Sequence, residues 1–67
     1  MALTLKAARV NAGLTQAEAA KQICISTATL FNYENGTSYP DVPVLKRIEK
    51  VYGVEYKNIF FLGIDQI

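Results

Sequence analysis

Residues 16–35, QAEAAKQICISTATLFNYEN, hold the pattern that decides the fold. Small and apolar residues recur there at the three-and-four spacing of one helix face, in two runs separated by a three-residue break. Thr15 lies three residues before Glu18, the spacing of a capping box, in which each side chain accepts a hydrogen bond from the other residue's backbone. Ser26 can cap the second run through its hydroxyl oxygen. The stretch therefore predicts two short helices joined by a tight turn, the second over 27–34.

The two faces of this second helix differ in chemistry. Leu30 and Tyr33 lie three residues apart and are expected to form an inner seam with Ile23 and Ile25. The chain has no Lys or Arg between residues 22 and 45, so no cation lies on the helix or on the loop after it. The residues of the opposite, outward face are Thr27, Ala28, Phe31 and Asn32.

Three further helices are expected around this pair. Thr4 can cap a helix over 5–12, and a fourth helix starts after Asp41 and ends at Gly53. A short fifth helix is predicted over 54–60, with Ile59 and Phe60 pointing inward. The chain is thus read as one all-α domain over 1–67, with its core in 4–60 and an apolar tail, 61–67, that either its own domain or another subunit should cover.

Composition excludes several functions. The chain has 67 residues, no histidine, one cysteine and a formal charge of +1. A zinc site or a histidine-based catalytic unit is therefore not expected, and we predict neither enzyme activity nor a cofactor. Cys24 is read as a small buried turn residue. Since no signal segment or long apolar run is present, we expect a cytoplasmic protein, and one small enough for an oligomeric interface to supplement its core.

Several residues together carry a family resemblance: Leu14-Thr15-Gln16 before the turn, Ala20 facing it, apolar Ile23, Ile25 and Leu30, and the ending Tyr33-Glu34-Asn35-Gly36 followed by Pro40. On these positions the chain resembles the Cro and phage-repressor type of helix-turn-helix regulator, the Xre family, over nearly its whole length. The resemblance implies a five-helix lambda-repressor-like DNA-binding domain with its helix-turn-helix at the second and third helices. It departs at Cys24, where the family usually has glycine and where a left-handed backbone would cost about 1 kcal/mol.

What the resemblance implies is a transcriptional regulator, of phage or prophage type, that binds a palindromic operator in double-stranded DNA as a homodimer. Base edges would be read by Thr27, Ala28, Asn32 and Phe31, a set that favours A·T pairs because guanine is most often read by Arg or Lys. Phosphates would be held by the start of the second helix, with Gln16 reaching alongside, and by uncharged donors after the third. Lys6 and Lys21 are the nearest cations. The full candidate set is Gln16, Lys21, Thr27, Ala28, Thr29, Phe31, Asn32, Asn35, Thr37, Ser38 and Tyr39.

Several of these predictions leave other interpretations open. Phe31 could be a core residue, a partner contact or a base contact, and Lys46, Arg47 and Lys50 are most simply a solvated helix face. The resemblance pairs Arg9 with Glu34 in a partly buried ion pair. The homodimer interface is placed on the segment from Pro40 to Val44, the fifth helix and the apolar tail. The other function considered is a protein-interaction module of the antirepressor type, with weak or no DNA binding.

Overall fold

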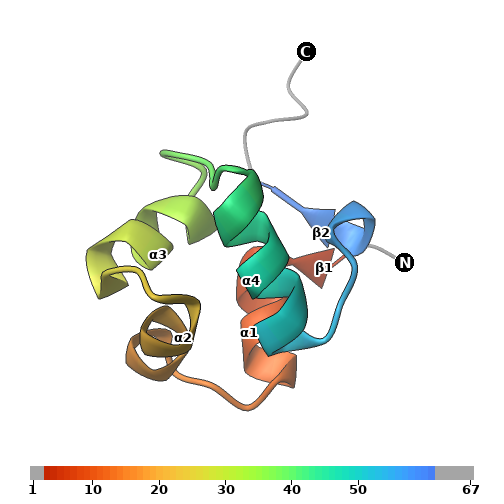
Figure 1. Cartoon of the computed structure of the whole chain (residues 1–67), viewed down its shortest axis with the longest axis horizontal. Coiled ribbons are helices and arrows are strands. Elements are labelled where there is room, and N and C mark those ends of the chain that lie inside the picture. Colours follow the sequence, from red (N-terminus) through yellow and green to blue (C-terminus); the bar gives the residue numbers. More distant parts are fainter. Residues whose placement is uncertain (1–2, 62–67) are drawn as a thin grey trace.

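The computed structural model describes residues 3–61 and places four helices around one core (Figure 1). The helices are α1 (Leu5–Asn11), α2 (Gln16–Ile23), α3 (Thr27–Glu34) and α4 (Val42–Tyr52). Two short strands, β1 (Leu3–Thr4) and β2 (Ile59–Phe60), and a 3-10 turn over Tyr56–Asn58 complete the order. In Figure 1, α2 and α3 form one side of the molecule, while α1 and α4 pack between them and the strands.

Each helix begins where the sequence supplies a cap. The Thr4 hydroxyl accepts from the backbone N–H of the third helical residue of α1 at 3.0 Å, and the Asp41 carboxylate caps α4 in the same way at 3.1 Å. At the start of α2, both bonds of the predicted Thr15 and Glu18 capping box form, at 2.9 and 3.1 Å. The Ser26 hydroxyl caps α3 at 3.0 Å. The local reading of the helix starts is therefore confirmed.

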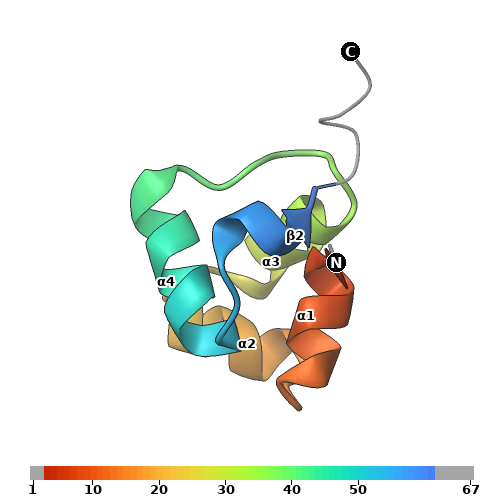
Figure 2. The ribbon, with the colours of Figure 1, turned by 90° about the vertical axis from the view of Figure 1, so that its right-hand side faces the viewer.

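The predicted fifth helix is wrong. Residues 54–60 contain the 3-10 turn and then β2, which pairs in parallel with β1 (Figure 1), so that Leu3 lies beside Ile59. Figure 2 shows β2 next to the first turn of α1. This pairing joins the two ends of the described chain, and no local periodicity of apolar residues in the sequence predicts it. Because successive strand side chains point to opposite faces, Ile59 is buried while Phe60 is 37% exposed, so only one of the two points inward.

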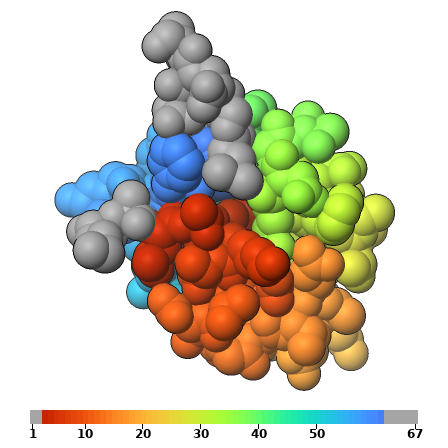
Figure 3. Space-filling model, turned by 180° about the vertical axis from the view of Figure 1, so that it is seen from behind, coloured from red at the N-terminus to blue at the C-terminus, as the bar shows by residue number. Residues whose placement is uncertain are grey.

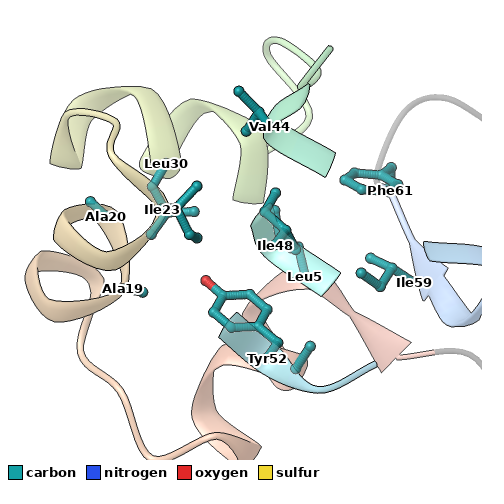
Figure 4. Close-up of a cluster of buried hydrophobic side chains, with 11 residues drawn as sticks. Leu5, Ala19, Ala20, Ile23, Leu30, Val44, Ile48, Tyr52, Ile59 and Phe61 are labelled. Carbon is teal, nitrogen blue, oxygen red and sulfur yellow. The ribbon is translucent and has the colours of Figure 1, made fainter. Parts of the chain in front are cut away.

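The core lies where all four helices meet (Figure 4). Ile23, Leu30 and Ile48 are its fully buried large side chains, and the small Ala19 and Ala20 of α2 are buried beside them. Ile25 and Tyr33, expected in the inner seam, are partly buried and pack against the edge of this core. No helix of the described residues is long and apolar enough to cross a membrane.

The first residue of the predicted apolar tail, residue 61, lies in the described part of the chain. Phe61 is 6% exposed and belongs to the core cluster of its own domain. This result satisfies one of the two alternatives for the first residue of the apolar tail. Residues 62–67 lie outside the described part of the chain.

Tyr52 places a polar hydroxyl group in the core. Its side chain is 7% exposed, and within the described residues its hydroxyl has no hydrogen-bond partner. Burial, reinforced by the charge of Glu34, raises the pKa of this hydroxyl to about 12. The folded protein therefore keeps a proton that an unfolded tyrosine would lose near pH 10.

We expect Tyr52→Phe to raise the free energy of unfolding at pH 7 by about 1 kcal/mol, because it removes a buried hydroxyl without a partner. A raised folded-state pKa contributes stability that is complete below pH 10 and is lost as the pH rises toward 12. The variant should lose less stability than the parent over this interval. Urea unfolding at pH 7, 10 and 12, followed by circular dichroism, measures both effects.

Tyr56→Phe is the matched control, because the Tyr56 side chain is 54% exposed and its hydroxyl is not desolvated by the core. Its stability should follow that of the parent at all three pH values. An equal change in both variants would show that burial of Tyr52 is not the cause.

Candidate nucleic-acid interface

The turn between α2 and α3 sets the angle of α3. Cys24 ends α2 in the left-handed conformation, with φ of 67°, and the following N–H of Ile25 donates to the carbonyl of Ala20 at 3.0 Å. The left-handed backbone expected at Cys24 is confirmed. For a residue other than glycine this conformation costs about 1 kcal/mol. The expectation of a buried thiol is wrong, since Cys24 is exposed. In this conformation the residue turns its side chain to solvent at the end of the helix.

A buried ion pair fixes the other end of α3. Arg9 Nε donates to Glu34 Oε2 at 2.6 Å and a terminal guanidinium nitrogen donates to Oε1 at 3.3 Å, with side chains 10% and 3% exposed. The remaining guanidinium nitrogen donates to the Leu14 carbonyl at 2.9 Å. The bonds to Glu34 hold the pKa of Arg9 above its ordinary value. The predicted pair is thus confirmed, and it ties α1, the loop before α2, and α3 together.

Gln16 belongs to the same network. Its amide nitrogen donates to Glu34 Oε1 at 3.0 Å, across the contact between α2 and α3. The sequence reading assigned Gln16 to DNA phosphate and did not foresee this bond. An amide nitrogen carries two hydrogens, so Gln16 can hold Glu34 with one and donate outward with the other.

A groove opens beside this network, where α1, the start of α2 and α3 come together. It is lined by Lys6, Arg9, Thr15, Gln16, Phe31, Glu34 and Asn35. Figure 3 shows the segments that meet on this side of the molecule. Three members of the candidate set, Gln16, Phe31 and Asn35, lie together there. The groove also includes Lys6, whose place beside Arg9 could have been read from their spacing of three residues on one helix.

The outward face of α3 lies in solvent as expected. Phe31 is 54% exposed, which excludes its assignment to the core, and Asn32 is partly exposed. The exposed residues at the start of the helix are Thr27 and Ala28. Thr29 is partly buried, and its hydroxyl lies 2.7 Å from that of Ser26 at the cap. Most of this face is therefore available to a partner.

The remaining candidates follow α3 or lie apart from it. The Asn35 amide donates to the Phe31 carbonyl at 2.8 Å and closes the last turn of α3. In the next loop Thr37 is exposed, Ser38 is partly buried and Tyr39 is 42% exposed. Lys21 is exposed in the last turn of α2 and does not line the groove.

Arg47 has a role that the sequence reading missed. Its Nε donates to the carbonyl of Ile23 at 2.7 Å, so it satisfies a free carbonyl at the end of α2, where a cation also meets the negative end of the helix dipole. Arg47 is partly buried, whereas Lys46 and Lys50 on the same helix are exposed, as expected. The 24 residues between Arg47 and Ile23 explain why no local signal revealed the bond.

Breaking the network should destabilise the fold strongly. Arg9→Met removes the guanidinium and leaves Glu34 as a buried charge with only Gln16 beside it, which is expected to lower the free energy of unfolding by about 3 kcal/mol. Urea unfolding followed by circular dichroism measures the loss.

The matched control is Lys57→Met, because Lys57 pairs with Glu55 at 4.0 Å and both side chains are more than 70% exposed. Its effect should stay below about 1 kcal/mol. Comparable losses in the two variants would contradict the importance assigned to burial of the Arg9 pair.

Comparisons with known proteins agree with this geometry. The helix-turn-helix family pattern matches residues 5–57. The chain is 40% identical over 56 residues to multiprotein-bridging factor 1c of Arabidopsis thaliana, which covers 84% of this chain and 38% of that protein. It is 38% identical over 63 residues to the HTH-type transcriptional regulator ImmR of Bacillus subtilis, which covers 94% of this chain and 48% of that regulator.

The chain therefore spans less than half the length of both relatives. No solved structure matches it significantly. The family match includes all four helices and the turn at Cys24. On this evidence the chain belongs to the helix-turn-helix family, in its Xre-type branch.

Proposed function

We propose that the chain is a sequence-specific DNA-binding transcriptional regulator whose α3 enters the major groove. The observation that carries the proposal is an exposed α3 face held firmly at both ends, by the Ser26 cap and by the Glu34 network. A recognition helix needs this combination, because its side chains must reach base edges from a fixed angle. The similarity to a protein named as a transcriptional regulator supports the same function.

The chemistry of α3 favours A·T pairs. Asn32 can bond adenine through two atoms of its amide, and Ala28 can pack against a thymine methyl. Thr27 can do either, and the exposed Phe31 ring adds a further apolar contact. Since α3 carries no Arg or Lys, it lacks the side chains that most often read guanine.

Phosphates would be bound along the groove and the loop after α3. Lys6 supplies a cation there, and Gln16 supplies its second amide hydrogen at the start of α2. Uncharged donors complete the set, namely Thr29, Asn35, Thr37, Ser38 and Tyr39, with Lys21 farther along α2. Few cations release few counterions, so we expect a shallow dependence of affinity on salt, which Lys6→Gln should reduce further.

A homodimer would place two α3 helices on successive turns of a palindromic operator. The proposed interface is the segment from Pro40 to Val44 with the chain that follows α4. Exposed apolar side chains gather there: Val42 is 62% exposed and Tyr56 54%, and both lie beside Leu45. Solvent-exposed apolar groups in one place are typical of a protein interface.

A protein-interaction module is the second candidate function. The absence of cations on α3 favours it, and so does the similarity to a protein named as a bridging factor. The two candidates differ in one direct measurement. A regulator shifts specific DNA at low salt, whereas an interaction module without DNA binding shifts none.

Asn32→Ala should abolish or strongly weaken specific binding, by about 1 to 3 kcal/mol, if Asn32 reads a base. The operator fragment is first selected from a random duplex pool with the parent protein. Fluorescence anisotropy with that fragment, over a series of salt concentrations, then gives the affinity and its salt dependence for both proteins.

Asn58→Ala serves as the control, since Asn58 is an exposed asparagine in the 3-10 turn, away from α3. It should bind like the parent. Half-sites dominated by G·C pairs would refute the A·T preference. Failure of any selected duplex to bind the parent at low salt would refute the DNA-binding proposal itself.

Val42→Asp should convert the dimer into a monomer, because it puts a charge into the proposed apolar interface at no cost to the core. Sedimentation equilibrium measures the mass. Val10→Asp is the matched control, since Val10 is 58% exposed on α1, outside the proposed interface. A parent that sediments as a monomer, or a Val42→Asp variant that stays dimeric, would rule out this interface.

A further inference from the structure

Most of the Lys and Arg side chains in residues 3–61 have no carboxylate within ion-pair distance. Within residues 3–61 every carboxylate is already engaged: Glu34 by Arg9, Glu55 by Lys57, and the other three by backbone N–H groups at residues 15, 44 and 56. Five cations of the same range have no carboxylate partner, namely Lys6, Lys21, Lys46, Arg47 and Lys50. Four of these five lie on α2 or on α4, where Lys46 and Lys50 also line a pocket with Glu49 and Glu55.

A separate groove between α2 and α4 has two of these cations and no carboxylate in its lining. It is lined by Gln22 of α2 and by Arg47, Lys50 and Val51 of α4. The three α4 residues share one helix face, since Lys50 and Val51 lie three and four residues after Arg47. Two cations, an amide and an apolar side chain are thus presented together, outside the groove described above.

The guanidinium of Arg47 is held in a position that leaves hydrogen-bond donors available for an anion in this groove. Its Nε bond to the Ile23 carbonyl at 2.7 Å holds the guanidinium in place and leaves the two terminal nitrogens with their hydrogens. A guanidinium held in one position loses little further freedom when it binds a carboxylate. Lys50 adds a second positive charge about one helical turn away, and Val51 adds an apolar side chain to the lining of the groove.

We propose that this groove, lined by Gln22, Arg47, Lys50 and Val51, docks an acidic segment of a partner protein. The segment would place one carboxylate on the Arg47 guanidinium, another on Lys50, and an apolar side chain on Val51. The match rests on charge complementarity, because no carboxylate lines this groove and no described carboxylate lies within ion-pair distance of Arg47 or Lys50. The proposal does not depend on DNA binding.

The position of the groove differs from that of the Lys6 groove. In Figure 1, α4 lies on the near side of the molecule, in front of α1. Seen from behind in Figure 3, segments of α1, α2 and α3 are exposed beside the segment that follows α4, and little of α4 is visible. The groove lined by Gln22, Arg47, Lys50 and Val51 shares no residue with the Lys6 groove. Binding at the two grooves can therefore be tested separately.

The test is an amide chemical-shift titration of the 15N-labelled chain with a blocked ten-residue peptide of alternating Glu and Leu. We expect saturable shifts at Gln22, Arg47, Lys50 and Val51. The corresponding Gln and Leu peptide should produce none. Lys50→Glu should weaken binding of the acidic peptide by about fivefold or more, the size expected for the loss of one exposed ion pair.

Lys57→Glu is the control, because it changes the net charge equally at a site away from the groove. Its peptide affinity should match that of the parent. The absence of shifts at the four groove amides, or equal weakening by both variants, would overturn the proposal. It would also be overturned if a DNA duplex shifted the same amides and lost affinity on Lys50→Glu, since the face would then belong to DNA.

Discussion

The buried carboxylate of Glu34 is the constraint on which the arrangement of the helices depends. A carboxylate that is only 3% exposed must be paired, and Arg9 and Gln16 supply three hydrogen bonds to it from two other helices. Those bonds leave α3 one orientation relative to α1 and to the start of α2. The turn at Cys24 fixes the same helix at its other end. Since the orientation of α3 is set twice, the residues on its outward face need not contribute to folding and can be chosen for recognition.

The starts of the helices could be predicted because their causes are local. A cap and its acceptor are three residues apart, so Thr4, Thr15, Ser26 and Asp41 could each be read from the sequence. The prediction of a fifth helix was wrong because the structure of this segment is determined by a contact with a distant part of the sequence. Ile59 lies in a strand only because Leu3, at the other end of the described chain, pairs with it. Two residues of strand are too few to give a periodicity that would distinguish them from a short helix.

In the candidate site, too, some properties could be predicted from local spacing and others depend on contacts that are distant in the sequence. The exposure of Thr27 and Ala28 followed from helical spacing and is confirmed. The pairing of Arg9 with Glu34 followed from the family resemblance, since 25 residues separate the two. Spacing could not decide whether Phe31 was core or surface, because its face of α3 is neither wholly apolar nor wholly polar. Nor could it show that Gln16 bonds Glu34, which requires the angle between α2 and α3 to be known.

Net charge was the least informative property of this sequence. A formal +1 predicts no partner, yet it averages over the whole chain and does not show that one groove has two cations and no carboxylate in its lining. Coulomb attraction is screened over about 8 Å in physiological salt, so a partner responds to the charges near its binding site and not to the sum over the chain. For Lys6 beside α3 and for Arg47 beside α2, the relevant quantity is the local excess. The net charge of a small domain is therefore a poor guide to the charge that any one groove presents.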